Sequence, residues 1–180
     1  GCFWCIEAPF KLLKGVTSVV SGYMGGHQES PDYESICSGI SGHAEVIKIV
    51  FDQQVVSLEL LLQVFFSLHD PTERNRQGND VGTQYRSIIF AGKQHHEIIQ
   101  EFIKKIDLSE FKNNEVETEV IFLNDVDTIE SSKKINEIFW PAENYHQNFY
   151  MNNESNPYCQ TVISPKLKKI KNLFPNIIEA

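Results

Sequence analysis

The chain has 180 residues, 41% of them hydrophobic, which suits one domain with a core large enough to fold without disulfides. A net charge of -8 argues against nucleic acid as a partner, because basic residues gather only between positions 166 and 171, where we expect the exposed face of a C-terminal helix. No apolar run approaches the roughly 20 residues that span a bilayer, and four cysteines do not suggest a disulfide scaffold, so we expect a cytoplasmic protein with reduced thiols and no membrane contact.

An amphipathic helix is predicted at the start of the chain. Phe3, Ile6 and Phe10 recur at steps of three and four residues, and Gly15 can supply a left-handed stop. Cys2 therefore lies where this helix begins.

Cys2 is the candidate nucleophile. A helix N-terminus offers unpaired N–H groups and a partial positive charge, which favour a thiolate, and Phe3 and Trp4 would surround the sulfur with apolar surface. Two other interpretations stay open. A cysteine beside aromatic residues is often a small core residue, and the spacing of Cys2 and Cys5 also fits a redox or metal pair, although one such pair is a weak zinc signal.

Two strands are expected next, over residues 16–23, which run into a turn at Gly25, and over residues 44–51, where polarity alternates. Glu45 shares its side of the second strand with apolar residues such as Ile47. A carboxylate in such a row is costly unless it is used or paired.

A helix capped by Ser57 is predicted to end before His69. Residues 70–82 are almost wholly polar, include Asp80, and form a loop long enough to be either functional or mobile.

The rest of the chain predicts a strand at 86–90, a helix around 98–103, a strand at 116–123 and an aromatic, histidine-containing segment at 140–150. Residues 151–180 are expected to form a long irregular tail.

These elements do not give the regular units of a doubly wound sheet, and no phosphate-binding glycine loop is present. We therefore predict an α+β fold, a two-layer mixed sheet flanked by helices with a ferredoxin-like core. Residues 1–180 are expected to form one domain, with Cys159 in its C-terminal tail.

A series of motifs in order along the chain resembles the peptide methionine sulfoxide reductase A family. They are Gly1-Cys2-Phe3-Trp4, Gly22-Tyr23-Met24-Gly25-Gly26, Gly42-His43-Ala44-Glu45-Val46, His69-Asp70-Pro71-Thr72, Asn75-Arg76-Gln77-Gly78, Gly82-Thr83-Gln84-Tyr85-Arg86-Ser87 and Ala142-Glu143-Asn144-Tyr145-His146-Gln147. The resemblance implies repair of oxidative damage by reduction of methionine-S-sulfoxide, free or in proteins, on an α+β fold.

The resemblance also implies roles for individual residues. Cys2 attacks the sulfoxide sulfur and Glu45 protonates the oxygen, a role that the apolar surroundings of Glu45 support because burial favours the protonated acid. Tyr33 and Tyr85 match phenols that donate hydrogen bonds to the sulfoxide oxygen, and Asp80 matches an aspartate that organises the site.

Phe3 and Trp4 correspond to the family's pocket for the substrate methyl group, which selects the epimer. Without the resemblance, Tyr33 and Tyr85 would be interpreted as ordinary core phenols. We expect His146 to be structural.

Attack leaves a sulfenic acid on Cys2, which a second thiol must resolve. Cys159 is preferred, because its tail contains proline and asparagine and is expected to be flexible, and many relatives carry a recycling cysteine near this place. Cys5 is the alternative, at a helical spacing that would require local unwinding to close a disulfide. Cys37 is expected to be buried and structural.

The resemblance implies thioredoxin as the reductant of a monomeric enzyme. No nicotinamide or flavin motif is present, and neither a cofactor nor a metal is expected. The alternatives are a thiol–disulfide oxidoreductase that uses Cys2 and Cys5, and a redox or metal sensor that binds through these thiols and a histidine. Neither alternative explains the accompanying acid and tyrosines.

Overall fold

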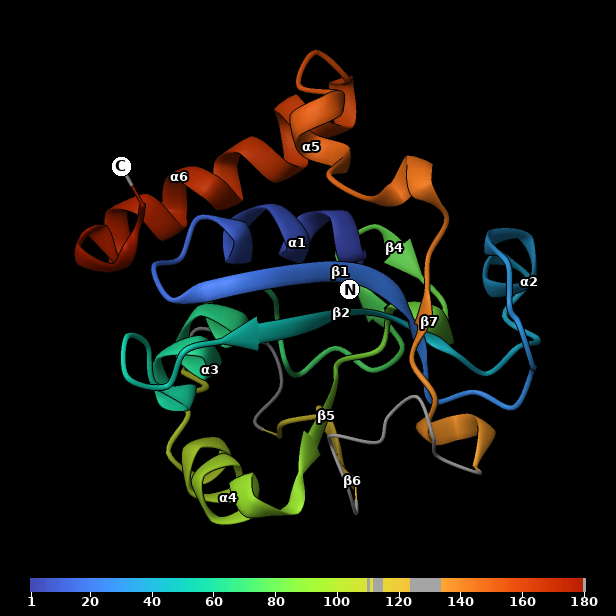
Figure 1. The fold of residues 1–180 in the computed structure, drawn as a ribbon, viewed down its shortest axis with the longest axis horizontal. Coiled ribbons are helices and arrows are strands. Elements are labelled where there is room, and N and C mark those ends of the chain that lie inside the picture. The colour runs from blue at the N-terminus through green and yellow to red at the C-terminus, as the bar shows by residue number, and fades with distance from the viewer. Residues whose placement is uncertain (110, 112–114, 124–133, 180) are drawn as a thin grey trace.

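Two long antiparallel strands form the centre of the fold (Figure 1). β1 (Val16–Met24) pairs with β2 (Ala44–Phe51) along its length, so that Met24 lies opposite Ala44. β7 (Trp140–Pro141) pairs with the other edge of β1 and gives the order β2-β1-β7. The computed structural model describes residues 1–109, 111, 115–123 and 134–179.

Helices cover one face of this sheet. α1 (Phe3–Lys11) packs on β1, and the C-terminal segment lies on the outer side of α1 (Figure 1). That segment comprises α5 (Phe149–Asn152), a π-helical turn (Cys159–Ile163) and α6 (Ser164–Leu173). The first helix is therefore enclosed between the strands and the end of the chain.

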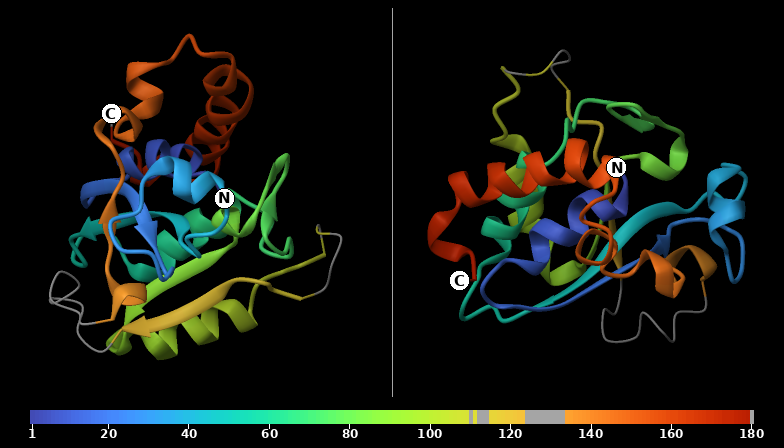
Figure 2. Two further views of the ribbon diagram at one scale, coloured as in Figure 1. Left: turned by 90° about the vertical axis from the view of Figure 1, so that its right-hand side faces the viewer. Right: turned by 90° about the horizontal axis from the view of Figure 1, so that it is seen from above.

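A second layer lies on the opposite side of β1 and β2 (Figure 2). Here β5 (Ile88–Gly92) and β6 (Glu119–Leu123) pair in parallel, and α3 (Leu58–Ser67) and α4 (His96–Lys104) pack with them in one apolar cluster. Met24, Ala44 and Val46 join this layer to the central strands through a further cluster.

The smallest elements gather at the end of the sheet where β1 finishes and β2 begins. α2 (Tyr33–Cys37) follows β1, and β3 (Arg76–Gln77) pairs with β4 (Asp80–Val81) in a short hairpin. In Figure 1, β4 lies beside the N-terminal end of α1, and α2 lies farther out on the same side of the molecule, beyond β7. This end of the molecule therefore collects most of the residues predicted for the site.

The predicted α+β class is confirmed, and so are the strands at 16–23 and 44–51. The helix predicted after Ser57 is also present, and the Ser57 side chain accepts a hydrogen bond of 3.2 Å from the backbone N–H of Leu60. Parallel and antiparallel pairs both occur, but the pairs between described residues form three separate groups rather than the one sheet that we had assumed for a ferredoxin-like core. No helix in the described parts of the chain is long and apolar enough to cross a membrane.

The helix expected to carry the lysines at 166–171 is present as α6. The predicted long irregular tail is wrong, because helical turns occupy most of residues 149–173. Ile163, Leu167 and Ile170 repeat at helical spacing and are buried against the rest of the molecule. The Nζ groups of Lys166 and Lys169 donate hydrogen bonds of 2.8 and 2.7 Å to backbone carbonyls at the end of α3. Those carbonyls have no partner within their own helix, so the contacts tie the two helices together.

Candidate active site

Cys2 occupies the N-cap of α1. Its backbone is extended, with φ -58° and ψ 128°, so the residue lies just outside the helix, and its side chain makes no capping hydrogen bond. Only 7% of Cys2 is exposed. The thiol therefore lies at the helix start that the sequence predicted, but it is buried.

Glu45 lies directly against this helix start. The backbone N–H of Phe3 donates a hydrogen bond of 3.0 Å to Glu45 Oε2. Burial raises the pKa of Glu45 to about 7, while the bond from Phe3 opposes the shift. Near neutral pH a substantial fraction of Glu45 is protonated and can give up a proton beside Cys2.

The two thiols of the first helical turn are hydrogen-bonded to each other. This bond raises the pKa of Cys2 well above its ordinary value, helped by burial and by the negative charge of Glu45. The same bond is the largest cause that lowers the pKa of Cys5 to about 7. The direction at Cys2 is therefore opposite to the lowered pKa that its place at the helix start led us to expect.

Tyr33 and Tyr85 both lie near Glu45. Burial raises the pKa of each phenol. At Tyr33 a hydrogen bond with Cys37 raises it further, and the negative charge of Glu45 adds to both shifts. Both hydroxyls therefore stay protonated and can act as hydrogen-bond donors. The structure brings together the acid and the two tyrosines that the family resemblance associated with it.

Aromatic rings form the wall beside Cys2. Trp4 stacks on Phe149 with ring centroids 3.6 Å apart, and Phe3, only 1% exposed, lies next to Trp4 with centroids 6.2 Å apart. Phe149 was not predicted, because nothing in its local sequence indicates that it reaches the first helix. The stack fixes the indole in one orientation.

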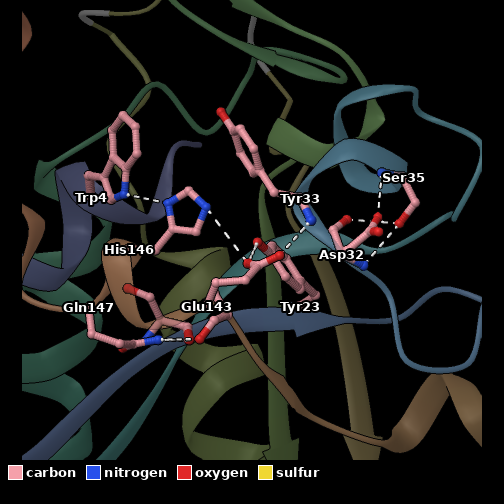
Figure 3. Close-up of polar contacts among 10 residues, drawn as sticks. Trp4, Tyr23, Asp32, Tyr33, Ser35, Glu143, His146 and Gln147 are labelled. Atoms are coloured by element: carbon pink, nitrogen blue, oxygen red, sulfur yellow. Dashed lines mark hydrogen bonds and ion pairs between the residues drawn. The ribbon is translucent and has the colours of Figure 1, made fainter.

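His146 orients the Trp4 ring of this wall. Trp4 Nε1 donates a hydrogen bond of 3.1 Å to His146 Nδ1, as Figure 3 shows. The accepting Nδ1 has no proton, and burial lowers the pKa of the imidazole, so the ring is neutral with its proton on Nε2. Nε2 lies 3.8 Å from Glu143 Oε2. These contacts agree with the structural role that we expected.

Glu143 is a positioning residue that the sequence analysis did not single out. Its two carboxylate oxygens accept hydrogen bonds of 2.8 Å, one from the Tyr23 hydroxyl and one from the Tyr33 backbone N–H (Figure 3). Gln147 fixes the same segment by exchanging hydrogen bonds with the backbone of Ser21. The start of α2, and with it Tyr33, is thereby tied to β1.

Asp80 reaches the site through a residue that we did not predict. Its Oδ2 accepts a hydrogen bond of 3.3 Å from the hydroxyl of Tyr158, and the same hydroxyl lies 3.3 Å from Cys5 Sγ. The only sequence signal for Tyr158 was its place before Cys159.

The two remaining cysteines differ from our expectations. Cys159 is fully buried in the π-helical turn, not on a flexible tail, and burial raises the pKa of its thiol. Cys37 ends α2 and is exposed, so the prediction that it is buried is wrong.

Comparison with known proteins decides the family. The family model described as peptide methionine sulfoxide reductase matches residues 1–177. The chain belongs to the peptide methionine sulfoxide reductase family. It is 48% identical over 180 residues to peptide methionine sulfoxide reductase MsrA of Chromobacterium violaceum, an alignment that covers 99% of this chain and 95% of the relative.

Solved structures of family members have the same fold. Methionine sulfoxide reductase A of Corynebacterium diphtheriae matches with a TM-score of 0.72 and 30% identity, over 87% of this chain and 73% of that one. Mxr1 of Saccharomyces cerevisiae in its reduced form also gives a TM-score of 0.72, with 28% identity over 90% of this chain and 86% of that one. The chain is thus an oxidoreductase of this family by sequence and by fold.

Proposed function

We propose that the chain reduces methionine-S-sulfoxide, free or within proteins, with Cys2 as the nucleophile and Glu45 as the proton donor. The contact that carries this proposal is the 3.0 Å hydrogen bond from the Phe3 N–H to Glu45 Oε2, which puts a readily protonated acid beside the thiol. A thiolate attacks a sulfoxide sulfur only when the oxygen is protonated or strongly hydrogen-bonded as its bond to sulfur breaks.

The first step transfers oxygen from substrate to enzyme. A protonated Glu45 no longer opposes negative charge on Cys2, whose proton can pass to the thiolate of Cys5. Cys2 then attacks the substrate sulfur, and Glu45 supplies the proton to the oxygen. The sulfoxide gains two electrons and leaves as a thioether, while the sulfur of Cys2 is oxidised to a sulfenic acid.

The aromatic wall and the phenols orient the substrate. In the proposed complex the methyl group contacts Phe3 and Trp4, and the oxygen faces Tyr33 and Tyr85. A tetrahedral sulfur that satisfies both contacts presents its electrophilic side to Cys2 in only one of its two configurations.

Strict preference for the S-epimer is therefore expected. We predict that purified enzyme in a single turnover forms methionine from resolved methionine-S-sulfoxide and leaves the R-epimer unreacted. Chromatography of the products measures both. Equal rates for the two epimers would contradict the assigned pocket, and no methionine from either would overturn the proposed function.

Cys5 is the resolving thiol in this proposal. Its thiol already contacts Cys2, and the extended backbone at Cys2 removes the helical spacing that counted against the pair, since Cys2 is not itself inside α1. Cys159 lacks the mobility that was the reason for preferring it. A disulfide between Cys2 and Cys5 would then be reduced by thioredoxin, so the pair takes part in the repair cycle and is not a separate activity.

A matched pair of variants tests this assignment. We predict that Cys5→Ser forms one equivalent of methionine and then stops, whereas Cys159→Ser keeps thioredoxin-linked turnover. Mass mapping after one turnover should find Cys2 joined to Cys5 in the parent and in Cys159→Ser. A disulfide between Cys2 and Cys159, with turnover lost in Cys159→Ser, would instead show that Cys159 is the resolving thiol.

A further inference from the structure

The hydroxyl of Tyr158 joins two side chains of the site that come from distant parts of the chain. It lies 3.3 Å from Cys5 Sγ in α1 and donates a hydrogen bond of 3.3 Å to Asp80 Oδ2 in β4. Cys5 is only 4% exposed and lies in an apolar cluster, where a hydrogen bond to sulfur is worth more than it is in water. The contact therefore bears on how readily Cys5 ionises.

The Tyr158 hydroxyl has one proton, so it can donate a hydrogen bond to only one partner at a time. A phenol donates one hydrogen bond and accepts others, whereas a thiolate only accepts. While the Tyr158 proton points to Asp80, the phenol oxygen can accept a hydrogen bond from the Cys5 thiol. Once Cys5 ionises, the phenol proton must turn to the sulfur, and Asp80, which is half-buried, can be hydrated instead.

We propose that Tyr158 is a positioning residue for the resolving step, in which its hydroxyl holds Cys5 Sγ in place and moves its hydrogen bond from Asp80 to Cys5 as that thiol ionises. The inference rests on the proposed function, in which Cys5 attacks the sulfenic acid on Cys2. In that attack an S–S bond forms and the S–O bond of Cys2 breaks. The oxygen leaves as water, taking up one proton equal to that released by Cys5, while the sulfur of Cys5 is oxidised and that of Cys2 is reduced.

The ring of Tyr158 is held independently of its hydroxyl. Trp4 meets it edge to face, with centroids 5.9 Å apart and planes at 75°, and the backbone N–H of Tyr158 donates a hydrogen bond of 2.9 Å to Asn156 Oδ1. Tyr158→Phe therefore removes the hydrogen bonds to Cys5 and Asp80 and keeps the packing.

Several charged and titratable groups surround Cys5. Cys2 and Lys166 lower its pKa, Asp80 raises it, and Glu45 and Cys159 also interact with it electrostatically. The hydrogen bond from Tyr158 lowers the pKa of Cys5 further. Loss of the hydroxyl should consequently shift ionisation of Cys5 to higher pH.

The test separates the two chemical steps. Enzyme is mixed with one equivalent of methionine-S-sulfoxide without reductant, methionine is counted, and the sulfenic acid is trapped with dimedone over time, from neutral to alkaline pH. We expect Tyr158→Phe to form the disulfide about tenfold more slowly, the rate equivalent of one lost hydrogen bond, and the midpoint of this step to move to higher pH. The Tyr158 hydroxyl also lowers the pKa of Cys2, but there it is the weakest of the contributions, so sulfoxide reduction should change less than disulfide formation.

Tyr150→Phe is the matched control, because the Tyr150 hydroxyl lies 3.0 Å from Ser164 Oγ and its ring packs on the same apolar cluster. It should alter neither the rate nor the pH midpoint of disulfide formation. Parental disulfide formation in Tyr158→Phe, or an equal loss in Tyr150→Phe, overturns the inference alone. A parent enzyme that forms no methionine overturns the proposed function as well.

Discussion

Cys2→Ser should form no methionine from methionine-S-sulfoxide, in a single turnover or with thioredoxin. A serine hydroxyl is far too weak a nucleophile at neutral pH, and no residue in the proposed site activates it for attack on sulfur. Stopped reactions analysed for methionine measure the loss. This is the largest effect that we predict for any single substitution in the chain.

The fold should survive this change. Cys2 makes no capping hydrogen bond, whereas serine is a favoured N-cap residue whose side chain can stabilise a helix by about 1 kcal/mol, so the melting temperature should not fall. Cys37→Ser is the control, because it removes an exposed thiol while the serine hydroxyl can keep the hydrogen bond with Tyr33, and it should keep full turnover. Measurable turnover by folded Cys2→Ser would end the assignment of the nucleophile.

Local patterns predicted the elements near the site well. The alternation over residues 44–51 identified β2 and the apolar surroundings of Glu45, because side chains alternate between the two faces of any strand. Ser57 likewise marked the start of α3, since N-cap chemistry involves residues only three positions apart.

The C-terminal helices depend on contacts that local patterns do not reveal. Asn156 and Pro157 suggested an irregular tail, yet Lys166 and Lys169 anchor the segment to carbonyls at the end of α3. The lysines at 166–171 were predicted to form a solvated face. Lys168, Lys169 and Lys171 are exposed, whereas Lys166 is half-buried, and the carbonyl partners of Lys166 and Lys169 lie about a hundred positions away in sequence.

The same limit applied to the site. The family motifs predicted the residues that we propose face the substrate, but the predicted roles of Cys159 and Cys37 rested on assumed mobility and assumed burial. Tyr158 was missed because its partners are 153 and 78 positions away, in Cys5 and Asp80. Such long-range pairs are set by tertiary packing.

Glu45→Gln should slow sulfoxide reduction by about 10²- to 10⁴-fold, the usual contribution of a general acid. The amide can still accept the hydrogen bond from the Phe3 N–H, but it cannot give a proton to the departing oxygen. Single-turnover formation of methionine measures the loss directly. The later disulfide step is not expected to slow to the same degree.

The pH dependence provides an independent readout. Because burial raises the pKa of Glu45 to about 7, the parent rate should fall as the pH rises through that value and the acid loses its proton. This limb of the profile should be absent in Glu45→Gln.

The free energy of unfolding should also fall as the pH rises. The raised pKa of Glu45 stabilises the fold fully below the ordinary value of 4.5, and that contribution is lost as the pH rises through about 7.

Glu45→Gln does not titrate, so its melting temperature should fall less than that of the parent between acidic and alkaline pH. Glu7→Gln is the matched control, since Glu7 is equally buried but bonds to Lys11 and to the backbone N–H of Asn148. It should keep the alkaline limb and the parental single-turnover rate. A folded Glu45→Gln enzyme that reduces the sulfoxide within a few-fold of the parent would exclude Glu45 as the proton donor, because no isosteric amide can perform that transfer.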